Sequence, residues 1–299
     1  MLNRLRFWRE RGWTEITAAD YAEAWARFGG SVVTHPLAVG RLSEMAEIPV
    51  RYFGWRAGDE LLAAIPAWGR HLALSKAVLK ARGKKGLFDL GNAETILPVA
   101  PEAAGIPLRH AARYLSALHE AALRGIRRQR EQLALARSLD DFSPKFRYNQ
   151  RRELRLLAEA GGTVRPVGEF SPAEFAAIYT ELFARRWGFP ATGAARMGDV
   201  FERLRDLMTG SVIFLDGAPV AAQVLYRVES PRWISVEFIN GGVDPQKRGF
   251  SPGSVLSWLN VQAEWENART RGKPLRYSFG RADREYKNRW CHLSPVFEV

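Results

Sequence analysis

The sequence predicts a protein of the mixed α+β class, with two domains in tandem at residues 1–140 and 141–299. First, 299 residues that are 46% hydrophobic and 25% charged are typical of a soluble globular chain with substantial cores. Second, strand–turn–strand patterns occur at Val50–Trp68 and again at Val212–Val228. Third, segments of helical periodicity surround both hairpins. We therefore expect each domain to be a mostly antiparallel twisted sheet flanked by helices.

The first domain begins with a capped helix and continues into the first hairpin. Thr17 is a suitable N-cap, and Gly29-Gly30 ends the apolar periodicity that follows it. The expected elements are a helix at Thr17–Arg27, a second helix after Pro36, strands at Val50–Trp55 and Glu60–Trp68, and a long helix from Leu108 to about Arg130.

Two helix starts of the same kind open the second domain. Ser143-Pro144 and Ser171-Pro172 each place a capping residue before a proline at the first helical position, and Glu174 completes a capping box. The expected elements are helices from Ser143, from Ser171 and from Met197 to about Thr209, strands at Thr163–Pro166, Val212–Leu215, Val220–Val228, Trp233–Ile239 and Leu275–Phe279, a helix after Ser251, and a strand near Pro295–Glu298.

The charge predicts an anionic partner. The formal net charge is +12, and Arg124–Arg155 alone holds ten basic residues against four acidic ones. Nucleic acid, an acidic membrane face, a nucleotide-bearing cofactor and an anionic envelope precursor all fit this charge. The basic helix within this span is equally well explained as a solvated helix face.

Other composition signals narrow the classes of protein. The single cysteine, Cys291, allows no intrachain disulfide and is expected to be buried. The five histidines lack metal-ligand spacing, so no metal is predicted. The N-terminus lacks the apolar core of a secretion signal, and no run of 18 apolar residues occurs. We expect a cytoplasmic protein whose basic, Trp-bearing start can rest on an anionic leaflet.

The segment Asp244–Leu256 combines the features of an anion-binding turn. Gly249 permits positive φ, Ser251 is a suitable N-cap, and Pro252 fits the first position of an apolar-periodic helix. Free N–H groups at such a helix start, beside cations, bind phosphate or pyrophosphate. An ordinary turn into a capped helix explains the same residues, and both interpretations remain open.

The second half of the chain resembles the FemAB-like branch of the GNAT acyltransferases. The similarity lies in the order of several motifs: KFRYNQRR from Lys145, a capped helix ending RRWG, DGAPVAAQ, VDPQKRGFSPGSVL, and YSFGRADREYKNRW ending at Trp290. This resemblance implies two tandem GNAT-like domains. Over its full length, including FWRERGWTEI and FGGSVVTHP, the chain more particularly resembles the Mig family of macrophage-inducible proteins. That family is associated with antimicrobial-peptide resistance and with the inner membrane of Gram-negative bacteria.

The resemblance implies an acyl or aminoacyl transferase and assigns candidate residues. The donor is implied to be acyl-CoA or aminoacyl-tRNA, and the acceptor an amine or envelope component. Ser251-Pro252 departs from the usual acyl-CoA loop, and Pro252 removes one N–H donor. The candidates are catalytic Glu237, Asp283, Tyr286 and Lys287; donor-binding Gln246, Arg248, Gly249, Ser251 and Gly253; and substrate-binding Asn149, Arg152 and Asn240.

Glu237 is also a candidate without the resemblance, because a carboxylate inside an apolar strand is costly unless it is paired or functional. Two further hypotheses stand beside the transferase. One is a catalytically silent relative that binds an anionic ligand and acts as a resistance factor. The other is a nucleic-acid-binding regulator, but the sequence has no helix-turn-helix, RRM or zinc-finger pattern, which argues against sequence-specific DNA recognition.

Overall fold

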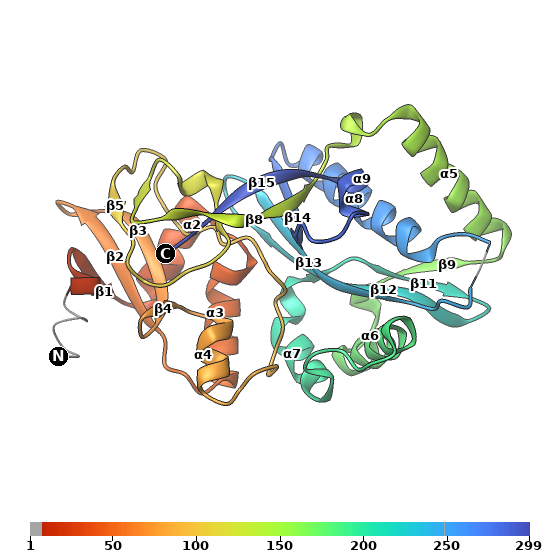
Figure 1. Ribbon diagram of the computed structural model, residues 1–299, viewed down its shortest axis with the longest axis horizontal. Helices are drawn as coiled ribbons and strands as arrows, with labels where there is room; N and C mark the ends of the chain where they lie inside the picture. Colours follow the sequence, from red (N-terminus) through yellow and green to blue (C-terminus); the bar gives the residue numbers. More distant parts are fainter. Residues whose placement is uncertain (1–7, 248) are drawn as a thin grey trace.

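The computed structural model describes residues 8–247 and 249–299, which form two parts side by side along the long axis (Figure 1). The N-terminal part has a four-stranded antiparallel sheet in the order β1-β2-β3-β4. The predicted hairpin and the capped first helix are confirmed, since Thr17 and Asp20 form a capping box. Its elements are β1 Trp13–Ile16, α2 Ala18–Phe28, α3 Pro36–Met45, β2 Arg51–Ala57, β3 Glu60–Trp68, β4 His71–Leu72, α4 Lys76–Ala81 and β5 Ile106–Pro107.

The long helix expected from Leu108 to about Arg130 is wrong. The segment contains the short strands β6 (Leu115–Ser116) and β7 (Leu123–Arg124) and the beginning of β8 (Arg127–Ala136). Tyr114 and Gly125 have φ of 55° and 85°, which an α-helix does not allow. The residues of β8 are good helix formers, but pairing with a strand on each side overrides that local preference.

The central sheet has nine strands in the order β6-β15-β8-β14-β13-β12-β11-β9, with β10 paired to β12. The strand β8 precedes residue 140 but lies between β14 and β15, so the two predicted domains share this sheet. The remaining strands are β9 Thr163–Pro166, β10 Met208–Thr209, β11 Ser211–Leu215, β12 Ala218–Glu229, β13 Ile234–Val243, β14 Leu275–Arg281 and β15 Cys291–Glu298.

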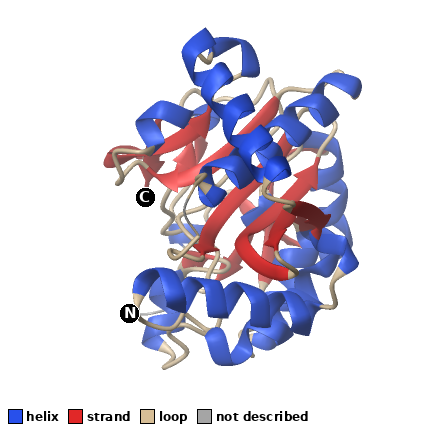
Figure 2. Cartoon of the chain, turned by 90° about the vertical axis from the view of Figure 1, so that its right-hand side faces the viewer, coloured by secondary structure: helices blue, strands red, loops and turns tan. Residues whose placement is uncertain are grey.

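Helices cover both faces of this sheet (Figure 2). Side chains of β12 alternate between the faces: Ala222, Val224 and Tyr226 pack with α6 in one core, whereas Ala221 and Leu225 face α8. The helices are α5 Pro144–Glu159, α6 Pro172–Trp187, α7 Met197–Leu204, α8 Pro252–Thr270 and α9 Lys287–Trp290. The helix expected from Met197 to about Thr209 ends earlier, because a 3₁₀ turn and β10 follow Leu204.

The strands β13 and β14 leave a space between them, because they pair in parallel for only part of their length. Their register runs from Ile234–Leu275 to Glu237–Ser278, and β13 continues to Val243 without further pairing to β14. The register between β12 and β13 shifts at Ile239, which is an extra residue on β13. The helix α8 connects the two strands, so its N-terminus lies where they separate.

Candidate functional site

A cavity of about 510 Å³ lies beside the separated ends of β13 and β14 and the first turn of α8. This volume is within the range of small-molecule sites. Its walls are partly aromatic and apolar, and backbone of β13 and of the turn into α8 forms one side. The lining includes Phe238, Gly241, Gly242, Phe250, Ser251, Gly253, Ser254, Ser257, Phe279, Tyr286 and Trp290.

Specific contacts fix the backbone of the turn that leads into α8. Asp244 pairs with Arg185 at 3.2 Å and accepts the Gln246 N–H at 2.9 Å, which fixes the start of the turn. Gly249 has φ of 109°, so the predicted need for glycine at this position is confirmed. Ser251 is the N-cap residue, but its side chain makes no capping hydrogen bond. Arg248 lies outside the described residues.

The cavity is electropositive. Among the described residues, Arg186, Lys247 and Arg289 line it beside one carboxylate, Asp244; Asp244 is paired with Arg185, and Lys247 with Asp216 at 3.2 Å. Burial lowers the pKa of Arg186, as expected for a cation that has lost part of its hydration. Sequence reasoning missed Arg186 and Arg289, although both lie inside the quoted motifs, in RRWG and YKNRW.

Glu237 lies on the other side of the sheet from the cavity. Phe238 lines the cavity, and adjacent strand residues point to opposite faces. The Glu237 side chain is buried and its Oε1 accepts the Glu94 N–H at 2.9 Å. Burial, and then the nearby Glu94 carboxylate, raise the pKa of Glu237 well above its usual value. Glu237 therefore holds a loop of the N-terminal part against the point where β13 and β14 separate.

Beside it, Arg276 forms a buried ion pair with Glu94. The Arg276 Nε donates to Glu94 Oε2 at 2.9 Å, and a second guanidinium nitrogen contacts the other carboxylate oxygen. The Glu94 side chain is 1% exposed and that of Arg276 18%. A planar guanidinium binding a carboxylate in this way fixes geometry as well as charge.

We expect Glu237→Gln to stabilise the protein increasingly as pH rises. The raised pKa means that folding favours the protonated acid, so the wild type loses stability as pH rises from about 4.5 through the folded-state pKa. The slope is at most about 1.4 kcal/mol per pH unit. Urea unfolding of both proteins between pH 5 and 8 measures it. Glu266→Gln, at an exposed site, is the matched control, and an equal pH dependence of Glu237→Gln and wild type contradicts the assignment.

The segment that follows β14 brings Tyr286 to the cavity and holds Asp283 and Lys287 beside it. Lys287 Nζ pairs with Asp283 at 3.1 Å. Partial burial alone raises the pKa of Asp283, but hydrogen bonds from Lys287 and Arg281 outweigh it and lower the pKa below its usual value. Burial raises the pKa of Tyr286. Asp283 is thus a weakened base, and among these three only Tyr286 lines the cavity.

The predicted substrate residues lie in two other places. Asn149 and Arg152 are exposed on α5, which stands at the edge of the molecule (Figure 1). Asn240 lines a separate pocket of about 40 Å³, and its Oδ1 accepts the Gly241 N–H at 2.8 Å. The outer face of α5 is strongly basic, and none of its basic side chains forms an ion pair within the described part of the chain; they are Lys145, Arg147, Arg151, Arg152 and Arg155.

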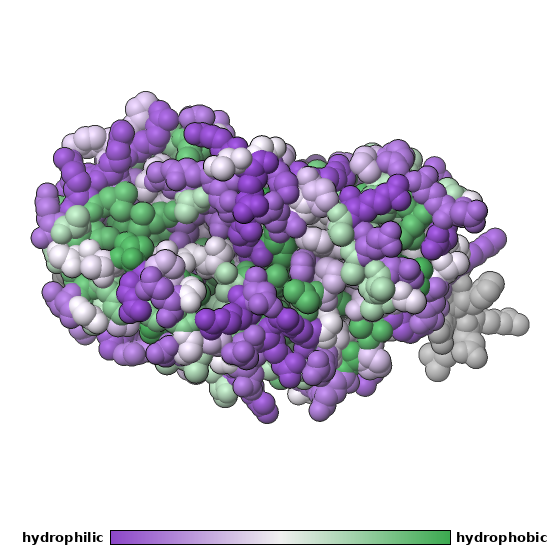
Figure 3. All heavy atoms as spheres, turned by 180° about the vertical axis from the view of Figure 1, so that it is seen from behind, coloured by the Kyte–Doolittle hydropathy of each residue, from purple (hydrophilic) through white to green (hydrophobic). Residues whose placement is uncertain are grey.

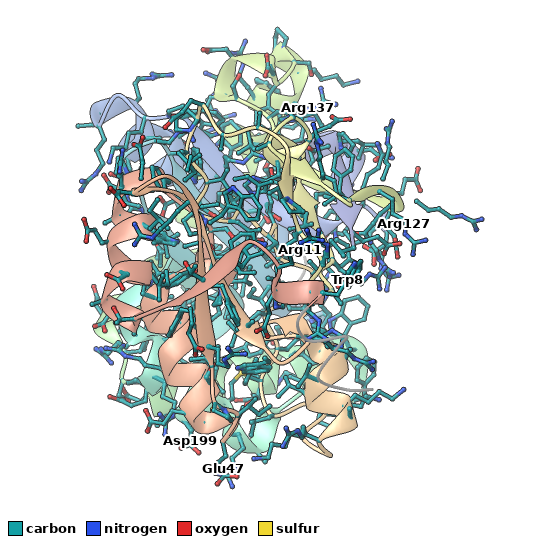
Figure 4. The ribbon with its side chains drawn as sticks, turned by 90° about the vertical axis from the view of Figure 1, so that its left-hand side faces the viewer. Trp8, Arg11, Glu47, Arg127, Arg137 and Asp199 are labelled. Carbon is teal, nitrogen blue, oxygen red and sulfur yellow. The ribbon has the colours of Figure 1, made fainter. Side chains whose placement is uncertain are left out.

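Two further hollows lie in the N-terminal part. One of about 420 Å³ is lined by residues such as His71, Asn92 and Tyr114. The other is an open groove in which the Arg109 guanidinium lies 5.1 Å from the centre of the Trp8 ring. Trp8 is seen on the same edge of the molecule as Arg11 and Arg127 (Figure 4). The face seen from behind in Figure 3 is largely hydrophilic, and its broadest apolar area lies over the C-terminal part.

Neither a metal site nor a membrane span is visible in the residues described. They contain no group of three or more His, Cys, Asp or Glu side chains that could hold a metal ion. No helix among them combines the length and apolar character needed to cross a bilayer.

Cys291 is buried, as predicted, and burial raises its pKa to about 12, so the thiol is a poor nucleophile.

Two solved structures have the same fold as this chain. FemX matches 96% of this chain and 96% of its own, with a TM-score of 0.57 and 11% identity. The C-terminal domain of a putative lysylphosphatidylglycerol synthetase from Agrobacterium fabrum matches 94% of this chain and 91% of its own, with a TM-score of 0.51 and 14% identity. The predicted mixed α+β class is confirmed, and the chain shares its fold with FemX.

The family follows from the sequence itself. The Mig-14 family model matches residues 35–299, and the chain therefore belongs to the Mig-14 family. A sequence comparison with curated proteins gives no match.

Proposed function

We propose that the protein transfers an acyl or aminoacyl group from an activated donor to an amine. The observation that carries this proposal is the cavity between the separated parallel strands, which opens beside a helix N-terminus and three cations. The donor is an acyl-CoA thioester or an aminoacyl-tRNA ester. Both present a reactive carbonyl on a long anionic carrier, which suits this positive cavity.

The chemistry needs positioning more than a covalent intermediate. The amine nitrogen attacks the donor carbonyl carbon, the C–N bond forms, and the bond from that carbon to sulfur or ribose oxygen breaks. The proton lost by the amine passes to the leaving thiolate or alkoxide. Holding both reactants in one cavity supplies much of the acceleration. Free backbone N–H groups beside the carbonyl supply more, because they stabilise the developing oxyanion.

Candidate residues divide into those that touch the donor and those that hold the site. We assign donor contact to Ser251, Gly253 and Tyr286, since these line the cavity. Asp283 and Lys287 hold the segment that presents Tyr286. Glu237 holds the loop on the opposite face, so its role is positioning. The exposed cations of α5, with Arg152 among them, offer a contact for the donor's phosphates outside the cavity.

For the acceptor we propose an envelope component, reached from the cytoplasmic face of the inner membrane. The resemblance to the Mig family implies such a role, together with a contribution to antimicrobial-peptide resistance. The basic helix α5 supports contact with anionic headgroups, because clustered Lys and Arg side chains are attracted to acidic leaflets.

A panel of donors tests the proposal. We expect one donor class to raise the melting temperature of the purified full chain and to transfer labelled acyl groups to amines. A donor at 100 times its Kd adds about 2.7 kcal/mol to the free energy of unfolding. The panel contains acetyl-CoA, longer acyl-CoAs, free CoA and aminoacylated tRNA, with phosphatidylethanolamine and a soluble polyamine as acceptors. Binding without transfer supports the silent anion-binding alternative, and binding of none contradicts both.

A further inference from the structure

The first turn of α8 is only partly available to a ligand. Pro252 has no N–H, and Val255 makes the first intrahelical bond, to the Ser251 carbonyl at 3.0 Å. Within the described residues, no acceptor meets the N–H groups of Gly253 and Ser254. The Ser251 N–H, in contrast, donates to the Glu153 carboxylate at 2.7 Å. An internal anion therefore already occupies part of this helix N-terminus.

The packing of α5 places the backbone of Glu153 beside the turn. Glu153 lies on α5 directly before Leu154, which packs on the core that contains Trp258 of α8. One turn further on, Leu157 packs with Phe250 and Leu256, so the same helix anchors the turn itself. Buried side chains therefore fix the backbone on both sides of the contact, while the contact itself lies at the surface.

This contact changes what the turn can bind. A pyrophosphate bound to the amides of Ser251, Gly253 and Ser254 would place its oxygens in contact with the Glu153 carboxylate. Like charges this close repel, and because the contact lies at the surface the repulsion weakens as the salt concentration rises. The negative charge of Glu153 also cancels part of the positive potential that the helix N-terminus provides.

We infer that Glu153 is a specificity-determining residue that excludes donors carrying a pyrophosphate at this turn. CoA thioesters are then rejected, and the cavity accepts acyl or aminoacyl esters whose phosphates lie outside it. This inference rests on the proposed function for the place of the donor, but not on any measured transfer. The residue that selects the donor thus comes from α5, about one hundred positions before the turn.

Glu153 also acts as a cap for α8, and a purely structural role must be separated from selection. The Ser251 side chain makes no capping bond, and Glu153 instead accepts the N–H of this N-cap residue, as the N3 carboxylate does in a capping box. The substitution Glu153→Gln separates the two roles. Glutamine retains a carbonyl oxygen that accepts the Ser251 N–H, and it removes only the charge.

The test is a calorimetric titration of free CoA and of inorganic pyrophosphate into full-length protein at one ionic strength. We expect Glu153→Gln to bind CoA at least about tenfold more tightly than wild type, which corresponds to about 1.4 kcal/mol. Glu159→Gln removes the same charge from an exposed site on α5 and should bind CoA as the wild type does. The inference is overturned if Glu153→Gln gains nothing, or if Glu159→Gln gains as much.

A second variant tests where on the protein the added affinity for CoA arises. Ser254→Trp, which fills the cavity, is combined with Glu153→Gln. Loss of the added affinity in the double variant supports binding at this turn. Affinity that survives places CoA elsewhere and overturns the inference. Absence of acyl transfer with every donor would defeat the proposed function and leave this binding result intact, so the two failures are distinguishable.

Discussion

The substitution Ser254→Trp is expected to weaken binding of the true donor by about a hundredfold or more and to abolish transfer. Ser254 is half-buried in the first turn of α8 and lines the cavity, so an indole ring at this position fills the space between β13 and β14. The change costs helix propensity only a few tenths of a kcal/mol, and the fold should persist. Titration of the donor identified in the panel measures the effect.

Ala263→Trp is the matched control, because it adds the same ring to the same helix at an exposed position. Circular dichroism and urea unfolding show whether both variants remain folded. If Ser254→Trp binds the donor as Ala263→Trp does, the donor site lies outside this cavity.

The substitution Arg276→Met is expected to cost about 3–5 kcal/mol of the free energy of unfolding at pH 7. It leaves the Glu94 carboxylate, 1% exposed, without its cation, and an uncompensated buried charge is strongly destabilising. Urea unfolding with a shared slope measures the change. The double variant with Glu94→Leu should recover most of the loss, since an apolar pair of similar volume often replaces a buried ion pair at little cost.

Arg271→Met provides the comparison for an exposed pair. Arg271 pairs with Glu229 at 3.1 Å, but its side chain is 51% exposed, so we expect a loss within about 1 kcal/mol. Equal losses for Arg276→Met and Arg271→Met would show that the buried pair contributes no more than a surface one.

Local signals predicted much of the fold. The N-caps Thr17 and Ser171, the hairpin pattern at Val212–Val228 and Pro252 each determine backbone geometry within a few residues, and each expected element formed. The helix predicted for Leu108–Arg130 was wrong because the structure of this segment depends on strands far away in sequence. Within it, Leu115, Ser116, Arg127 and Arg128 pair with β15, which local periodicity cannot indicate.

The residues of the candidate site also differ in whether the local sequence could predict them. The turn at Gly249–Gly253 was visible because glycine, serine and proline define it locally. Glu153 was not, because its contact with Ser251 spans 98 positions. The available signal was an acidic residue placed between Arg152 and Arg155 of α5. Glu237 stood out as a carboxylate in an apolar strand, but only the pairing pattern shows which face it occupies.

The place of β8 in the sheet has a consequence for how the chain folds during synthesis. Its two neighbours are contributed by residues 275–298, so both hydrogen-bonding edges of β8 stay open until these residues leave the ribosome. Pairing over such sequence separations is slow, and an unpaired strand edge promotes aggregation. The arginines at the start of β8 counter this hazard, because charged side chains on an open edge disfavour association between nascent copies.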